Sequence, residues 1–155
     1  MLECHVNGID IDPFNPFNEK NFATIKHEPF EHQYQDSTIR IQSYILPHKT
    51  KVNLEEWEKY EGKGGYTKNQ GFYVYRANRL IIDGGWMGLT NSSNLSDLAR
   101  IEINVPVSVD EEWQTDVKKS SLQLPPLIKA KLRNLIKLPK KKSRRRAWFH
   151  FRWSR

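Results

Sequence analysis

Residues 70–82 read Gln-Gly-Phe-Tyr-Val-Tyr-Arg-Ala-Asn-Arg-Leu-Ile-Ile, the most informative stretch of the chain because it predicts a compact β-hairpin. Alternation along the first strand places Phe72 and Val74 on one face and Tyr73 and Tyr75 on the other. Ala77-Asn78 predicts a two-residue turn, since asparagine tolerates positive φ. The hairpin holds no catalytic acid, base or nucleophile motif, so we interpret it as scaffold.

The segments on either side of the hairpin predict more strands and two helices. Asn7-Gly8 is typical of a tight turn, which predicts a first hairpin over residues 2–11. Residues 22–34 and 37–46 are expected to form two long strands joined near residues 35–36, and Ile39 and Ile41 share one face of the second. Alternation also predicts a strand at 99–106. Asn53 is a suitable N-cap for a helix over 53–60, whereas residues 107–124 are expected to be mostly loop. Ile128, Leu132, Leu135 and Ile136 recur at helical spacing and predict an amphipathic helix over 126–138. We therefore expect an α+β fold, with a mixed β-sheet and two or more helices.

Length and composition predict one folded domain followed by a tail. The chain has 155 residues, of which 37% are hydrophobic and 12% aromatic, enough for a single core. We assign residues 1–138 to the domain and 139–155 to a basic, aromatic tail. Cys4 is the sole cysteine, so intrachain disulfides and cysteine zinc sites are excluded and a reducing compartment is expected. With no signal sequence and no apolar run long enough for a membrane span, we predict a cytoplasmic protein.

Charge is distributed very unevenly along the chain. Residues 1–116 contain all 18 acidic residues and only 11 of the 25 lysines and arginines, a balance of −7. Residues 117–155 contain the other 14 basic residues and no acid. This asymmetry indicates an anionic partner for the C-terminal quarter, or its docking against an acidic surface.

Two sets of residues suggest catalytic or metal chemistry but lack the pattern it requires. Gly62-Lys63-Gly64-Gly65 is rich in glycine like a phosphate-binding loop, but no Lys-Ser/Thr pair opens a helix after it. We interpret it as a flexible connector, with a phosphate cradle as the lesser alternative. The histidines are scattered and never have the spacing of metal ligands on a helix. We therefore predict no catalytic residue and no metal site.

Lys118-Lys119 is a better candidate for binding an anion. The pair stands in a loop, with Trp113 and Asp116 before it and Leu124, Pro125 and Pro126 after it, and these residues can hold the loop in place. A lysine ammonium held in this way is a suitable point-charge partner for a phosphate. The alternative is a pair of solvated surface lysines.

The tail offers a second, different possibility. Basic and aromatic residues alternate there, a composition that can neutralise phosphates and stack on exposed bases. A terminal strand over 147–153 with a basic flank and a membrane-surface anchor are the alternatives. The candidate nucleic-acid-binding residues are Lys140, Lys141, Lys142, Arg144, Arg145, Arg146, Trp148, Arg152 and Trp153.

Taken together and in order, several motifs resemble one family. They are Asn7-Gly8 with Asp12-Pro13-Phe14, Tyr44-Ile45-Leu46-Pro47-His48, Gly65-Tyr66 leading to Gln70-Gly71-Phe72-Tyr73-Val74-Tyr75-Arg76, Asn78-Arg79-Leu80-Ile81 with Gly85-Trp86, Leu98-Ala99-Arg100-Ile101-Glu102-Ile103, and Trp113-Gln114-Thr115-Asp116-Val117-Lys118-Lys119-Ser120. Over about residues 1–138 the chain resembles the second, transducer half of bacterial MORC-like GHKL ATPases, the superfamily of gyrase B, MutL and heat-shock chaperones.

The resemblance implies a fold like the second domain of small-subunit ribosomal protein five. It also implies that one lysine of the transducer reaches the γ-phosphate of ATP, which a GHKL domain holds together with Mg²⁺. In the family the sensing lysine stands three residues before an apolar residue. Lys119 stands in that position relative to Leu122, so the resemblance implies Lys119 as the sensor, with Lys118 second.

The chain departs from the family pattern in lacking the GHKL motifs. It has no Asp-x-Gly-x-Gly, no asparagine-box helix with its glutamate and no nucleotide lid. We therefore expect a domain, a truncated reading frame or a subunit acting in trans, which would not hydrolyse ATP alone. The expected partner is a GHKL domain, upstream in cis or supplied in trans, and homodimers are a further possibility.

Overall fold

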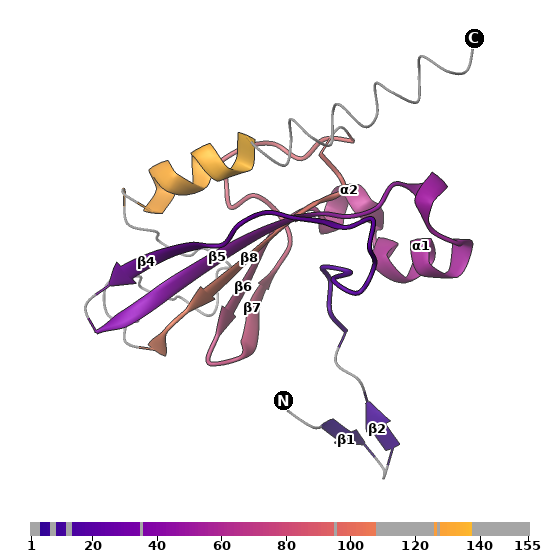
Figure 1. Ribbon diagram of the computed structural model, residues 1–155, viewed down its shortest axis with the longest axis horizontal. Helices are drawn as coiled ribbons and strands as arrows, with labels where there is room; N and C mark the ends of the chain where they lie inside the picture. The colour runs from indigo at the N-terminus through magenta and orange to yellow at the C-terminus, as the bar shows by residue number, and fades with distance from the viewer. Residues whose placement is uncertain are drawn as a thin grey trace.

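A mixed six-stranded sheet forms the centre of the structure, with helices at one end and on one face (Figure 1). The computed structural model describes residues 4–6, 9–11, 14–34, 36–94, 96–107, 126 and 128–137. The strands, all part of the sheet except the β1–β2 pair, are β1 Cys4–Val6, β2 Ile9–Ile11, β3 Ile25–Lys26, β4 Phe30–Tyr34, β5 Ser37–Ile45, β6 Gly71–Arg76, β7 Arg79–Asp83 and β8 Ala99–Val105. The helices are the short η1 Lys49–Lys51, α1 Leu54–Glu61, α2 Gly65–Asn69 and a segment at residues 128–137, called here the covering helix. The predicted α+β class is confirmed.

The hairpin predicted over residues 70–82 forms as β6 and β7. β6 pairs with β7 antiparallel, and Ala77 and Asn78 in the turn have φ of 48° and 61°. Positive φ at both central residues defines the type I′ turn, whose twist matches that of the strands. The first hairpin, β1–β2, also forms around residues 7–8 and makes a separate two-stranded sheet.

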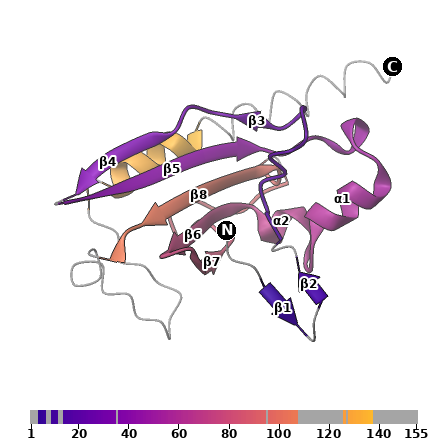
Figure 2. The same ribbon diagram turned by 60° about the horizontal axis from the view of Figure 1, so that its bottom comes forward.

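β8 is the central strand of the sheet, although it is the last of the described strands in chain order. The order β3-β5-β8-β6-β7 places it between β5, to which it is antiparallel, and β6, to which it is parallel. Figure 2 shows β8 lying along β5 on one side and β6 on the other. The predicted strand at 99–106 is confirmed over Ala99–Val105.

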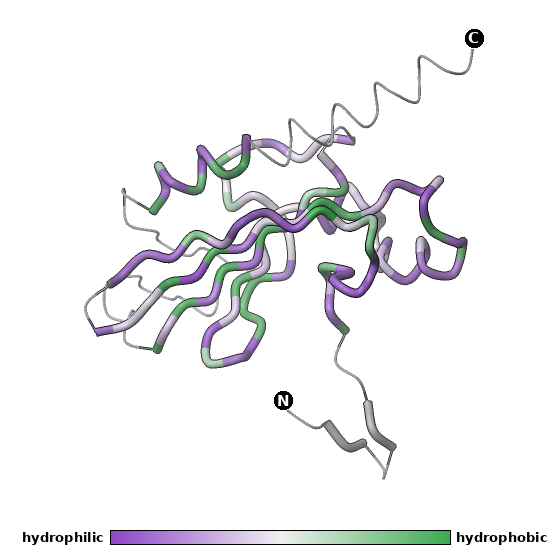
Figure 3. Tube along the Cα trace, in the orientation of Figure 1, coloured by the Kyte–Doolittle hydropathy of each residue, from purple (hydrophilic) through white to green (hydrophobic). Residues whose placement is uncertain are grey.

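The main core lies between the sheet and the covering helix. Apolar residues recur along the central strands and on the helix (Figure 3). The buried residues are Ile39, Ile41, Phe72, Val74, Trp86, Ala99, Ile101, Ile103, Val105, Ile128, Leu132 and Ile136. The predicted apolar stripe of residues 126–138 is thus confirmed over the described residues, with Leu135 partly buried at its margin.

The opposite face of the sheet carries aromatic and polar residues. Phe17 stacks on Tyr44 with 4.7 Å between ring centroids and meets Tyr73 edge-on at 5.5 Å. Tyr75 packs at the margin of this cluster. The predicted alternation, with Tyr73 and Tyr75 on the face opposite Phe72 and Val74, is confirmed.

Two elements differ from the sequence-based expectation. The strand expected over residues 22–34 begins only at Ile25 and is broken into β3 and β4. The His27 N–H still bonds to the Ser43 carbonyl of β5 at 3.0 Å, but Pro29 has no N–H to donate and regular pairing resumes at Phe30. The helix α2 has no counterpart among the predicted elements, since Gly65 and Thr67 are poor helix formers. Tertiary contacts support it: Tyr66 stacks on Trp57 of α1 at 4.1 Å and donates a hydrogen bond to the Trp57 carbonyl.

Candidate functional site

The lysines predicted to sense phosphate, Lys118 and Lys119, lie outside the described residues. So do the candidate nucleic-acid-binding residues of the tail, Lys140, Lys141, Lys142, Arg144, Arg145, Arg146, Trp148, Arg152 and Trp153. The structure does describe both segments that flank the lysines in sequence. One is residues 105–107, where β8 ends at Val105 and the chain continues to Val107. The other is the covering helix.

The neighbouring strands bring arginines to the end of the sheet where β8 ends. Arg76 is the register partner of Val105 on one side and of Arg79 on the other. Arg40 of β5 is the register partner of Asn104. Figure 2 shows the ends of β8 and β6 beside the start of β5. Arg40 therefore shares the sheet face of Asn104, whereas Arg76 and Arg79 share the opposite face with Val105. The chain leaves the central strand toward Lys118 and Lys119 from this end.

Two of these arginines, Arg40 and Arg79, are only weakly neutralised by acids. Arg40 is about half exposed and lies 3.9 Å from the Glu31 carboxylate, a long surface ion pair of little energetic value. Arg79 is exposed and makes no ion pair with a described residue. Like charges directly opposite each other across a hairpin, as at Arg76 and Arg79, are destabilising. Guanidinium groups bind phosphate oxygens in a bidentate manner, so this end suits an anionic ligand.

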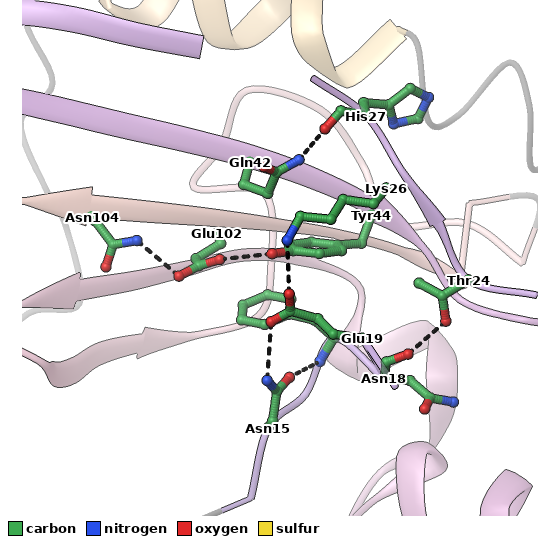
Figure 4. A network of polar contacts seen from close by, with 11 residues as sticks. Asn15, Asn18, Glu19, Thr24, Lys26, His27, Gln42, Tyr44, Glu102 and Asn104 are labelled. Carbon is green, nitrogen blue, oxygen red and sulfur yellow. Dashed lines mark hydrogen bonds and ion pairs between the residues drawn. The ribbon is translucent and has the colours of Figure 1, made fainter. Parts of the chain in front are cut away.

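Glu102, the acid on β8 nearest this end, is already held by two side chains. Its Oε2 accepts a hydrogen bond from Tyr44 Oη at 3.1 Å and its Oε1 one from Asn104 Nδ2 at 2.8 Å (Figure 4). Burial, together with the charge of Glu102, raises the pKa of Tyr44 well above its ordinary value. Tyr44 therefore stays a phenol that donates to Glu102, which positions the strand and leaves this acid engaged in structure.

Polar contacts hold the loop of residues 14–24 in position (Figure 4). Lys26 Nζ lies 2.8 Å from Glu19 Oε2 and over the Tyr44 ring, while Asn15 Nδ2 donates to Glu19 Oε1. Burial raises the pKa of Glu19, but the hydrogen bonds from Lys26 and Asn15 outweigh it and lower that pKa. Glu56 of α1 accepts from Asn18 and Asn21, both at 2.7 Å. The loop thereby joins the aromatic face of the sheet to α1.

Arg100, at the start of β8, is a structural cation of the core. It is 1% exposed, its Nη1 donates to the carbonyls of Asp97 and Ala99, and its guanidinium lies over the Tyr66 ring. Burial lowers the pKa of Arg100, and burial raises the pKa of Asp97 although Arg100 lowers it. The group is too enclosed to meet a ligand, so we assign it to the support of α2 and β6.

The glycine-rich segment at residues 62–65 is a connector between α1 and α2. Asn69 Nδ2 donates to the Glu61 carbonyl at 2.6 Å and to the Lys63 carbonyl at 3.4 Å. Gly64 has φ of 97° and precedes a helix of only five residues. The loop is thus closed on itself by Asn69, which favours the connector over a phosphate cradle.

Neither metal ligation nor membrane crossing is indicated by the part of the chain that the structure describes. No group of three or more histidine, cysteine, aspartate or glutamate residues there could hold a metal ion. None of the described helices is both long enough and apolar enough to cross a bilayer. Comparisons with protein-family models, curated proteins and solved structures find no match to this chain.

The sequence patterns assign no role to the three arginines at the end of β8. Arg76 and Arg79 flank the hairpin turn, so their proximity follows from the predicted hairpin itself. Arg40 lies 36 positions earlier in the chain than Arg76 and reaches this end only because β8 inserts between β5 and β6. A local sequence pattern therefore could have indicated two of the three.

Proposed function

We propose that this chain is the transducer module of a GHKL-type ATPase, which senses the γ-phosphate of ATP through Lys119, with Lys118 as the second candidate. One observation carries the proposal. Three sequence-distant segments of the family pattern meet in the sheet: one ends β5 at Tyr44 and Ile45, and the other two form most of β8 and β6, the strands next to it. The segment toward Lys119 leaves the central one of these strands, β8. ATP and Mg²⁺ would be held by a GHKL domain in cis or in trans.

The sheet supports a mechanical role for that segment. β8 has six register partners on β5 and six on β6, so its end cannot shift without shifting both neighbours. A lysine paired with the γ-phosphate would link the orientation of this sheet to that of the nucleotide-binding domain. Hydrolysis removes the charge partner and loosens the link, as in other phosphate-dependent switches. Arg76 and Arg79 are register partners and so share one face of the sheet, and they would add positive potential near that phosphate.

The test is reconstitution with a GHKL ATP-binding domain that forms a complex with this chain. We expect the chain to bind ATP weakly alone and to raise the turnover of the GHKL domain. Lys119→Ala should abolish that gain, whereas Lys118→Ala should reduce it less. Lys63→Ala, which removes an exposed lysine from the connector, is the matched control and should keep the gain.

An equal gain from the wild-type chain and Lys119→Ala, with Lys118→Ala also unchanged, would reject the lysine assignment. Failure of the wild-type chain to change turnover in a complex shown to form would reject the transducer role itself. A stable complex is checked first by size-exclusion chromatography, so that a missing partner is not mistaken for a missing function.

A further inference from the structure

The covering helix carries a stripe of positive charge on the side away from the core. Lys129, Arg133 and Lys137 recur every four residues, so they lie along one side of the helix, about 6 Å apart along its axis. Arg133 and Lys137 are exposed and Lys129 is half-buried. No acidic residue occurs anywhere in residues 117–155, so nothing within the helix offsets the charge.

Nothing in the described fold explains the stripe. Neither Lys129 nor Arg133 nor Lys137 forms an ion pair or a hydrogen bond with a described residue. Like charges four residues apart on a helix slightly destabilise it. Lys131 is different, because its Nζ lies 3.9 Å from the centroid of the Phe30 ring and so covers the edge of the core. The three other cations make no comparable contact with a described residue, which favours a binding role.

We propose that the Lys129–Arg133–Lys137 stripe binds the phosphate backbone of a nucleic acid. A row of cations at this spacing on a rigid helix suits a polyanion, whose phosphates repeat at similar short intervals along each strand. Basic residues are also frequent in the sequence after the helix, where Trp148 and Trp153 are residues of the kind on which bases stack. This inference is independent of the proposed ATPase role.

The packing of the same helix argues against a membrane surface as the partner. A basic helix that lies on a membrane inserts its apolar face into the bilayer. Here Ile128, Leu132 and Ile136 are at most 4% exposed and pack against the sheet. The apolar face is thus already used by the protein's own core, and only the cationic side is left for a partner.

The test measures binding of the full chain to a fluorescein-labelled duplex DNA by anisotropy, at several salt concentrations. The variant K129Q/R133Q/K137Q should lose about tenfold or more in affinity, and its slope of log K against log salt should be shallower by about 2 to 3. The matched control K49Q/K51Q/K63Q removes three exposed lysines elsewhere and should keep both affinity and slope. Glutamine preserves helix formation, and equal thermal melts of the three proteins would show that the fold is intact.

Three results would overturn the proposal. One is a wild-type chain that does not bind the duplex at low salt. Another is a triple variant whose salt slope equals that of the wild type, which would place the binding outside the stripe. The last is tighter binding to polyglutamate, or to vesicles containing phosphatidylserine, than to DNA, with that binding lost in the triple variant.

Discussion

Gly71 lies directly against Gly85: a Cβ atom built on Gly71 would stand 2.1 Å from the Gly85 carbonyl oxygen. The two residues form a parallel bridge, and the N–H groups of Phe72 and Gly85 bond to the carbonyls of Gly85 and Gln70 at 2.8 and 2.7 Å. Gly71 also has φ of 114°, a conformation that other residues rarely adopt. The start of β6 therefore depends on the absence of a side chain at this position.

Gly71→Ala should be among the most destabilising single substitutions in the chain, at about 3 kcal/mol or more, because a backbone clash adds to a strained φ. Gly85→Ala is the matched control. Gly85 has φ of 78°, but a Cβ there meets nothing within 4 Å, so only backbone strain of about 1 kcal/mol is expected. Urea unfolding measures both values, and equal costs would contradict the close approach.

Gln70→Met should destabilise the protein by about 3 kcal/mol, because it leaves several buried polar groups without partners. Gln70 is fully buried, and its Oε1 accepts from Trp86 Nε1 at 3.0 Å and from Ser96 Oγ at 2.7 Å. Its Nε2 donates to the carbonyls of Thr67 and Ser93. Methionine matches glutamine in shape but makes none of these bonds.

Ser96→Ala provides the comparison for Gln70→Met, since it removes a single donor to Gln70. A loss of about 1 kcal/mol in the free energy of unfolding is expected for that substitution. The two variants are compared by urea unfolding with tryptophan fluorescence, which also reports on Trp86. Similar losses in both would show that Gln70 is not the centre of the network.

Stability should fall steeply above about pH 10, where tyrosine ordinarily ionises. Burial raises the pKa of Tyr44, Tyr66 and Tyr73, and burial followed by the charge of Glu102 raises the pKa of Tyr75 to about 12. Between about pH 10 and 12 the unfolded chain has lost protons that the folded chain keeps. Each such tyrosine then lowers the free energy of unfolding by about 1.4 kcal/mol per pH unit.

Tyr75→Phe isolates one of these contributions. Between about pH 7 and 9 all tyrosines are protonated in both states. In this range the free energy of unfolding of the variant should differ from that of the wild type by a constant amount. Between about pH 10 and 12 its stability should fall less steeply, by about 1.4 kcal/mol per pH unit. The measurement is urea unfolding at each pH; identical slopes for both proteins would place the Tyr75 pKa at its ordinary value.

Arg79→Gln should raise stability slightly while weakening the proposed response to ATP. Arg79 stands opposite Arg76 across the hairpin, and removing one of two facing like charges is worth about 0.2 to 1 kcal/mol. In the reconstituted ATPase the same change should reduce the gain in turnover, because it lowers the positive potential at this end. Arg79→Lys keeps the charge and serves as the control for both measurements; an unaltered ATPase gain in Arg79→Gln would remove this arginine from the proposed phosphate environment.

Local patterns in the sequence are enough for the elements whose geometry is set by neighbouring residues. The turn at Ala77-Asn78, the Asn53 cap, which accepts from Glu56 N at 2.8 Å, and the apolar stripe of the covering helix all form as predicted. Each depends on preferences or periodicity within a few residues. The break between β3 and β4 was not predicted, although Pro29, which has no N–H for a ladder, is a local signal for it.

Other features are decided only by tertiary structure. The helix α2 forms where propensity is poor, because Tyr66 is held by Trp57 and Arg100 from other elements. β8 pairs with β5 and β6, strands that are far from it in the chain, and no local pattern determines this pairing. The insertion of β8 alone brings Arg40 to the end of the sheet that carries Arg76. The sequence by itself determined the α+β class, the hairpin and the excess of positive charge near the C-terminus. Tertiary packing decided which charges share a surface, because burying one face of each element determines which side chains are left outside.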